Sequence, residues 1–213
     1  MKTARFEFNL FGVNTYIVWD PVSLEAAIID PGMQSQDECK ALDEFISKNG
    51  LRPKHLINTH LHIDHTLGDD YVSAKYGLPL EASADDKFLG EARNSQSKMF
   101  HLNLGDLKPL EIGRELSDGH KIKIGNGELE VISVPGHSPG SIALYSAADR
   151  FVITGDALFR GSIGRTDLPG GDGDTLRRAI RTRLLSLPAD TTVLPGHGPA
   201  TMIATERSSN PWV

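Results

Sequence analysis

The alternation of hydrophobic and polar residues predicts a chain that opens with strands and then mixes strands with helices. Phe6, Phe8 and Leu10 alternate with polar residues, the two-residue period of a strand with one buried face. Short runs rich in β-branched and aromatic residues predict further strands at residues 13–19, 26–29, 55–58, 78–82, 121–124, 129–134, 141–146, 151–154 and 191–194.

Helical spacing of apolar residues recurs between these strands. Leu42, Phe45 and Ile46 follow the helical period within residues 36–49, and Gly50 is a typical C-terminal stop. The same pattern predicts helices at residues 67–76, 85–98 and 176–187, whereas residues 99–119 have weak periodicity and are expected to form a loop-rich insertion.

The order of these elements favours an α/β (α+β) fold in which each half of the chain forms one sheet covered by helices. This order suits a four-layer αββα sandwich. Because no repeat, low-complexity segment or linker divides the sequence, we predict a single domain over residues 1–213.

Composition narrows the function classes. The formal net charge is -6 and no basic block is present, so we expect no nucleic-acid partner. No apolar run is long enough to cross a bilayer, which argues against a membrane protein. The first seven residues lack the apolar core of a signal peptide, and Cys39 is the only cysteine; we therefore expect a cytoplasmic protein.

One short segment concentrates metal-binding side chains. Residues 59–65 read Thr-His-Leu-His-Ile-Asp-His and supply His60, His62, Asp64 and His65. Three further segments end a predicted strand in a tight turn that presents another candidate ligand, and these ligands are His137, Asp156 and His197. Glycine and proline in these turns let the backbone turn sharply and stiffen it.

Seven candidate ligands are enough for two cations with positions left for water. Imidazole and carboxylate without thiolate suit zinc, iron or manganese, and we expect two divalent ions, zinc before the others. The open, cysteine-free set indicates a catalytic site and not a structural one. His55, His101 and His120 lie outside this pattern and are expected to be ordinary surface or core residues, while Cys39 is expected to serve packing.

These motifs resemble the metallo-β-lactamase superfamily, and the resemblance extends from Asn14 to Pro211. It implies an αββα sandwich with the metals at one edge between the sheets. By motif position, the first metal would be held by His60, His62 and His137. The second would be held by Asp64, His65 and His197, with Asp156 as the bridge between the two.

Within the superfamily, the segments at residues 155–159 and 164–167 resemble glyoxalase II (hydroxyacylglutathione hydrolase), in its short bacterial form without the C-terminal helical domain. The resemblance implies that Arg165 contacts the substrate, and Phe159 and Arg160 are candidates for the same pocket. The tyrosine that glyoxalase II carries shortly after its last histidine is absent, and Gly198-Pro199-Ala200 stands there instead.

The implied activity is hydrolysis of a small-molecule thioester such as S-lactoylglutathione by a metal-bound hydroxide. Asp64 and Asp156 would orient the water and share its proton. The sequence leaves open whether the protein forms a homodimer. The first alternative is an oxidoreductase, a persulfide dioxygenase with one iron on His60, His137 and Asp156, and the next is a lactonase. Metal analysis separates the first two, because two ions favour hydrolysis and one iron with oxygen uptake favours the dioxygenase.

Overall fold

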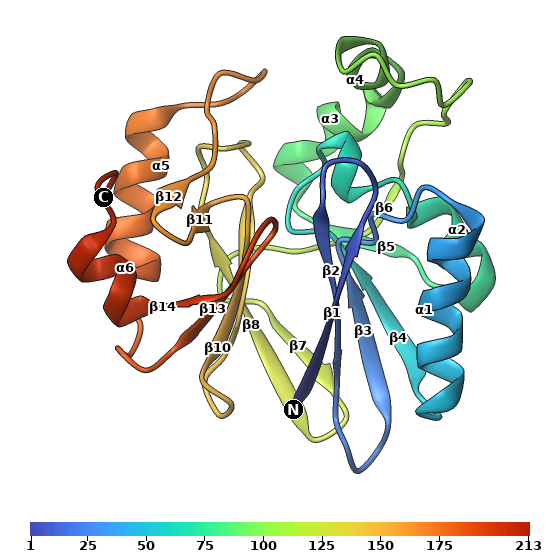
Figure 1. The fold of residues 1–213 in the computed structure, drawn as a ribbon, viewed down its shortest axis with the longest axis horizontal. Coiled ribbons are helices and arrows are strands. Elements are labelled where there is room, and N and C mark those ends of the chain that lie inside the picture. The colour runs from blue at the N-terminus through green and yellow to red at the C-terminus, as the bar shows by residue number, and fades with distance from the viewer.

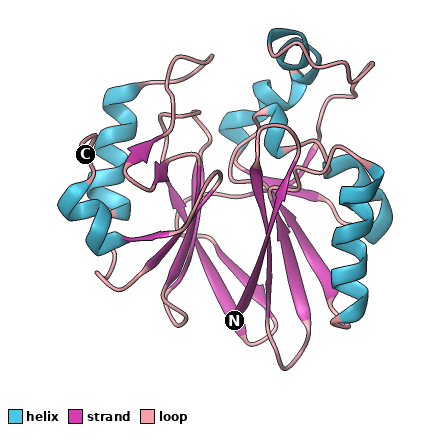
Figure 2. Cartoon of the chain, in the orientation of Figure 1, coloured by secondary structure: helices cyan, strands magenta, loops and turns pink.

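The computed structural model describes residues 1–213 and contains two six-stranded sheets that face each other (Figures 1 and 2). The first sheet has the order β1 (Lys2–Phe8), β2 (Val13–Trp19), β3 (Glu25–Ile29), β4 (Arg52–Ile57), β5 (Leu80–Ala82) and β6 (Ile112–Glu115). The second has the order β14 (Thr201–Met202), β13 (Thr192–Pro195), β10 (Phe151–Gly155), β9 (Ile142–Ser146), β8 (Gly127–Ser133) and β7 (Lys121–Ile124). A small hairpin, β11 (Leu158–Phe159) with β12 (Ser162–Ile163), follows β10.

Alternate residues of each strand face two different apolar cores. In β2, Tyr16 and Val18 belong to the core between the sheets, whereas Ile17 belongs to the core beneath the helices of the first sheet. In β9, Leu144 faces the core between the sheets and Tyr145 faces the helices of the second sheet. The central strands of each sheet are therefore buried on both faces, which explains why they are apolar at most positions and do not alternate strictly.

Helices cover the outer face of each sheet. On the first sheet they are α1 (Gln36–Lys48) and α2 (Asp69–Tyr76), and on the second they are α5 (Gly173–Ala179), which continues as the π-helical η3 (Ile180–Leu184), and α6 (Ile203–Ser209) (Figure 1). A capping box starts α1, since Ser35 Oγ accepts from Glu38 N and Glu38 Oε2 accepts from Ser35 N. The predicted four-layer αββα arrangement is confirmed.

Two local predictions need correction and a third needs an addition. The helix predicted at 85–98 is divided into η2 (Ala84–Asp86), α3 (Lys87–Glu91) and α4 (Arg93–Met99), with the break at Ala92. Arg93 is buried immediately after the break, where its guanidinium binds Asp70 and two backbone oxygens. Residues 99–119 are loop-rich as predicted, but they also contain β6, which pairs with β5 as a parallel edge strand. Leu10 lies in the turn after β1 and is 69% exposed.

The turns that carry the candidate ligands meet at one edge of the two sheets. β4 leads into residues 60–65, where η1 (Ile63–His65) forms a single helical turn. β8, β10 and β13 lead to His137, Asp156 and His197 respectively. The two sheets thus approach the same place with ligands from both sides. No helix of the chain has the length and apolar character that crossing a membrane demands.

Candidate metal centre

The seven predicted ligands form three overlapping groups. The groups whose ligand atoms all lie within 4.8 Å of one another are His60–His62–His137, His60–His65–Asp156 and Asp64–His65–His197. Every candidate ligand belongs to at least one group, and His60, His65 and Asp156 connect the outer two. The structure therefore brings together all seven residues that the sequence singled out, in the arrangement expected of two neighbouring cations.

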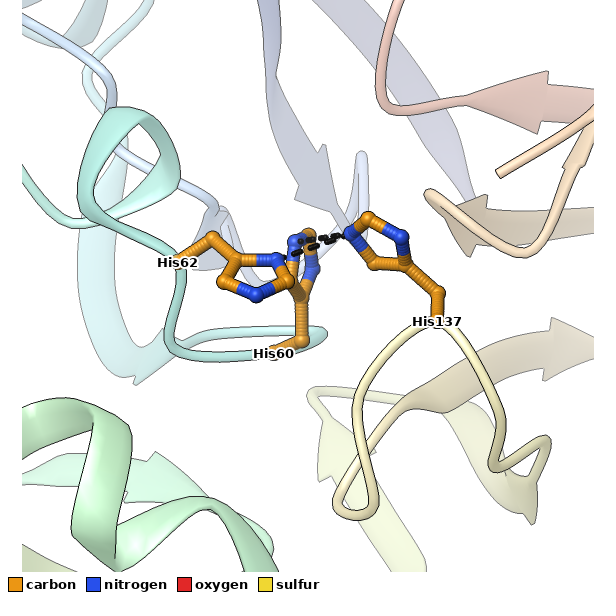
Figure 3. A group of neighbouring side chains, drawn as sticks. All are labelled: His60, His62 and His137. Carbon is orange, nitrogen blue, oxygen red and sulfur yellow. Dashed lines mark hydrogen bonds between the residues drawn. The ribbon is translucent and has the colours of Figure 1, made fainter. Parts of the chain in front are cut away.

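Nitrogen atoms converge in the first group (Figure 3). His62 Nδ1 lies 2.8 Å and His60 Nε2 3.2 Å from His137 Nε2. Nitrogens bound to a tetrahedral zinc ion at 2.0–2.1 Å lie roughly 3.3 Å apart, so this spacing is close to that of a metal-bound trio. In the third group, His65 Nε2 lies 3.3 Å from His197 Nε2, and His197 Nε2 lies 3.3 Å from Asp64 Oδ2.

Hydrogen bonds on the far side of the His137 and His197 rings leave the Nε2 atom of each free for a metal. Nδ1 of His137 donates to the backbone oxygen of Arg165 at 2.7 Å, and Nδ1 of His197 donates to that of Phe11 at 3.0 Å. A carbonyl oxygen only accepts, so the proton sits on Nδ1 and Nε2 keeps its lone pair. Such outer partners are what orient metal-binding histidines in known sites.

Asp30 supports the centre from behind and was not among the residues predicted from the sequence. Its carboxylate accepts from Thr59 N and Thr59 Oγ at 2.7 Å each, and its Oδ2 lies 3.1 Å from His65 Nδ1. Its backbone φ of 50° places it in the left-handed region, which few residues other than glycine adopt. The signal that could have found it is an aspartate directly after a strand of the same sheet.

Asp86 is a second residue that the sequence reading missed. This buried carboxylate accepts from Leu61 N at 3.0 Å, Ser138 Oγ at 2.7 Å and Gly140 N at 2.6 Å. Leu61 lies between His60 and His62, and Ser138 follows His137. Asp86 therefore joins the two turns that supply the first group of ligands.

Electrostatics favours the metal-binding forms of His60, His62 and Asp156. Burial, and then the neighbouring imidazoles, hold the pKa of His60 well below its ordinary value and lower that of His62 to about 3. Burial raises the pKa of Asp156, but His65, His197 and His137 outweigh it and the net pKa is lowered. Neutral imidazole and ionised carboxylate are the forms that bind metals.

The carboxylates around His65 favour positive charge at this point of the centre. Burial lowers its pKa, yet Asp156, Asp64 and Asp30 outweigh burial and raise it well above the ordinary value. Three carboxylates around one buried imidazole make a strongly negative pocket, which a divalent cation would neutralise better than a proton. The side-chain atom Asp156 Oδ1 is moreover buried without a hydrogen-bond partner. Such an orphaned atom fits a site built for metal ions.

A glycine in the last ligand turn is required by close packing. A Cβ on Gly196 would lie 2.2 Å from Asp156 Oδ1 and 2.8 Å from His65 Cε1. The turn that presents His197 can therefore approach the other ligands only because position 196 carries no side chain.

The centre opens into a cavity of about 370 Å³, and its lining includes Phe11, Phe100, Arg165 and Leu168 besides five candidate ligands. Phe159 is half-buried, with its ring centroid 6.2 Å from that of His197. Arg160 is exposed and does not line the cavity. Arg165 lines it, but its guanidinium makes a two-bond ion pair with Asp167. The substrate roles of all three stay predictions.

Comparison with known proteins agrees with this geometry. The family model of the metallo-beta-lactamase superfamily matches residues 8–197. Bacillus subtilis has a probable metallo-hydrolase, YqgX, that is 39% identical over 100% of this chain and 98% of its own length. The hydroxyacylglutathione hydrolase GloC of Haemophilus influenzae is 37% identical, again over 100% of this chain and 98% of its own length.

Two solved structures are similar throughout. The BLEG-1 B3 metallo-beta-lactamase superposes with a TM-score of 0.88 at 31% identity and covers 99% of both chains. The di-iron-bound form of TTHA1623 has a TM-score of 0.86 at 34% identity and covers 99% of this chain and 100% of that one. The chain belongs to the metallo-beta-lactamase superfamily. Its relatives and its cluster of histidines and aspartates make it a metallo-hydrolase of that superfamily, and the expected glyoxalase II-like character is supported by GloC.

Proposed function

We propose that the protein hydrolyses a small-molecule thioester, in the manner of a hydroxyacylglutathione hydrolase, with two divalent metal ions. The observation that carries the proposal is the pair of outer ligand groups linked by Asp156. Asp156 Oδ1 lies 3.3 Å from His65 Nε2, and Asp156 Oδ2 lies 3.5 Å from His197 Nε2 and 3.7 Å from His137 Nε2. One carboxylate thus faces both groups, which is the position of a bridging ligand.

His60, His62 and His137 would hold one ion and Asp64, His65 and His197 the other. Zinc suits these ligands, and iron or manganese suits them as well. When bound, such ions lower the pKa of water and stabilise negative charge on the carbonyl oxygen under attack. The di-iron form of the similar TTHA1623 structure supports a centre of two ions.

The chain's own residues supply orientation and a place for the proton. Asp64 is ionised, because the effects of His65 and His197 outweigh the burial that would raise its pKa. Ionised Asp64 and Asp156 can accept hydrogen bonds from a water between the two groups and hold it for attack. The pKa of an ordinary thiol is about 8.5, so a thioester releases its thiol as thiolate without a dedicated acid. Beside the ligands, Arg165 is the one charged residue lining the cavity, and its charge is paired with Asp167.

The test is a hydrolysis panel on purified protein loaded with zinc, iron or manganese. S-lactoylglutathione, a simple acyl thioester, a lactone and a β-lactam are compared at matched metal content, with metals per chain measured by mass spectrometry. We expect two ions per chain and the highest kcat/KM on a thioester. One iron per chain with oxygen uptake on a persulfide would replace the proposal by the dioxygenase, and faster opening of the lactone would replace it by a lactonase.

A matched pair of variants ties the activity to the centre. His62→Asn removes a candidate ligand, and His120→Asn makes the same change at an exposed position outside the centre. We expect His62→Asn to lose at least one ion per chain and at least 100-fold in kcat/KM, which is the scale of losing a metal's Lewis acidity. Full thioesterase activity in His62→Asn would contradict the proposed centre.

A further inference from the structure

A second, apolar pocket opens beside the metal centre. Its volume is about 90 Å³, and α3, α4 and the loop at residues 168–169 supply its walls. It shares His62, Phe100 and Leu168 with the cavity of the metal centre. A ligand bound at the metals can therefore reach this pocket directly.

The pocket is apolar in character. Phe88, Leu89, Ala92 and Met99 form its walls together with the shared Phe100 and Leu168. Gln96 also lines it, but its amide is already engaged: Oε1 accepts from Ile63 N at 3.0 Å, and Nε2 donates to the backbone oxygens of Leu89 and Leu61. These bonds fix α4 against the segment that carries the first ligands, so the pocket keeps a set position relative to the centre.

Two side chains at this pocket are more exposed than apolar residues usually are. Phe88 is 40% and Met99 is 51% exposed. Across the cavity, Phe11 packs edge-on against Phe100 with ring centroids 5.8 Å apart. A substrate with an apolar group would cover these surfaces, which gains free energy in proportion to the apolar area removed from water.

We propose that this pocket binds the acyl group of the substrate and that the preferred substrates are thioesters of short, apolar carboxylic acids. The proposal rests on the thioesterase function proposed above. The pocket's volume of about 90 Å³ is roughly a quarter of the 370 Å³ of the neighbouring cavity, so it suits an acyl chain of only a few carbons, for which a butanoyl group is the probe.

Size and polarity assign the acyl group, and not the thiol, to this pocket. A thiol carrier is larger and polar, and it fits the cavity of about 370 Å³ that contains Arg165 and the charged ligands. The apolar pocket is too small for such a carrier and has no free charge to bind it. The thioester carbonyl would then lie at the metal centre, with its acyl chain pointing toward α3 and α4.

The experiment measures kcat/KM for acetyl, propanoyl, butanoyl, hexanoyl and octanoyl thioesters of one thiol. Each value is divided by the rate constant for hydrolysis of the same thioester by free hydroxide, which removes differences in intrinsic reactivity. We expect a rise of about fourfold per methylene from acetyl to butanoyl, roughly 15-fold in all, and no further rise beyond hexanoyl. A flat series would overturn the inference and leave the thioesterase function intact. A second series keeps the acetyl group and lengthens an alkyl thiol, and a steeper rise there would overturn the acyl assignment.

Variants of opposite effect test the pocket itself. Ala92→Leu fills it and should reduce the butanoyl-to-acetyl ratio to near one, whereas Met99→Ala widens it and should move the preferred acyl group to a longer chain. Ala74→Leu makes the same change as the first variant at an exposed position of α2 and should leave the ratio as in the wild type. Equal ratios in Ala92→Leu, Met99→Ala and the wild type would overturn the inference.

Binding without turnover separates this inference from the proposed function. Acetate, butanoate and hexanoate are titrated into the zinc-loaded protein by calorimetry. Tighter binding of butanoate than acetate, lost in Ala92→Leu, supports the pocket even if no thioester is cleaved. Equal affinity for all three carboxylates overturns it, whatever the thioester panel shows.

Discussion

Asp86 provides the sharpest test of how this centre is built. Its carboxylate accepts three hydrogen bonds from two different ligand turns, and it is buried. In Asp86→Asn one oxygen becomes an amide that donates. If the amide faces Gly140 N, two donors oppose each other there; if it faces Leu61 N, that buried N–H loses its acceptor while Ser138 Oγ can still accept.

The size of the stability loss follows from the hydrogen bonds that the amide of Asp86→Asn cannot form. A hydrogen bond to a charged group contributes about 1.5–3 kcal/mol, and an unsatisfied buried donor costs about 1–3 kcal/mol. Burial raises the pKa of Asp86, so the neutral amide avoids part of the cost of burying a charge. We therefore expect Asp86→Asn to lose about 2–4 kcal/mol of stability. For a chain of this size that lowers Tm by roughly 5–15 °C.

Asp86→Asn should also weaken metal binding. Leu61 N lies between His60 and His62, and partners that orient ligands typically change metal affinity by about 10–100-fold. Thermal unfolding and competition with a zinc-binding dye measure the two effects. Asp85→Asn is the control, because Asp85 is exposed and adjacent. If Asp86→Asn matched Asp85→Asn within about 0.5 kcal/mol and in zinc affinity, the coupling of the two turns through Asp86 would be refuted.

Three further predictions concern the centre and the surface. In Gly196→Ala the new Cβ meets Asp156, and metal content by mass spectrometry should fall below that of the wild type; unchanged content would show that the turn can move aside. Burial raises the pKa of Asp43, but hydrogen bonds from Lys75, Tyr71 and Tyr76 outweigh it and lower the net value. Its contribution is therefore present above the unfolded pKa of about 3.9 and is lost as pH falls through the lower folded value. Asp43→Asn should lower Tm at pH 7 by roughly 2–6 °C, with the gap closing in strong acid; a gap independent of pH would refute the assignment. Removing metal with a chelator should lower Tm by roughly 5–10 °C for each site that had been held at 100 times its Kd, and an unchanged Tm would argue against metal binding.

The ligands were predictable because each lies in a short local pattern. His60, His62, Asp64 and His65 lie within six residues, and the other three follow strands in glycine-containing turns. The apolar periodicity likewise located most strands and the layer arrangement, because burial of both sheet faces leaves a strong signal in the sequence.

The supporting residues were not predictable from local pattern. Asp86 accepts a hydrogen bond from Gly140 N, 54 residues away in the sequence. From the sequence alone, an aspartate before a helix is most simply interpreted as a helix cap. The break in the helix predicted at 85–98 has a similar origin. Arg93 is drawn inward by Asp70 and by backbone oxygens at Thr66 and Lys108, and none of these contacts is visible in a helical period. Tertiary contacts, not propensity, decide these positions.

The origin of the ligands explains how metal binding and stability are related. His60 and His62 follow the first sheet, while His137 follows the second; Asp64 and His65 again follow the first, while His197 follows the second. Either ion would thus tie the two sheets together. The sheets are already joined without metal, because a shared apolar core lies between them and Asn14 donates to the backbone oxygens of Pro195 and Gly198. Because that core does not depend on the ligands, bound metals would add to stability without being needed for folding. The centre could consequently keep open coordination positions for substrate, which a metal site responsible for the fold could not.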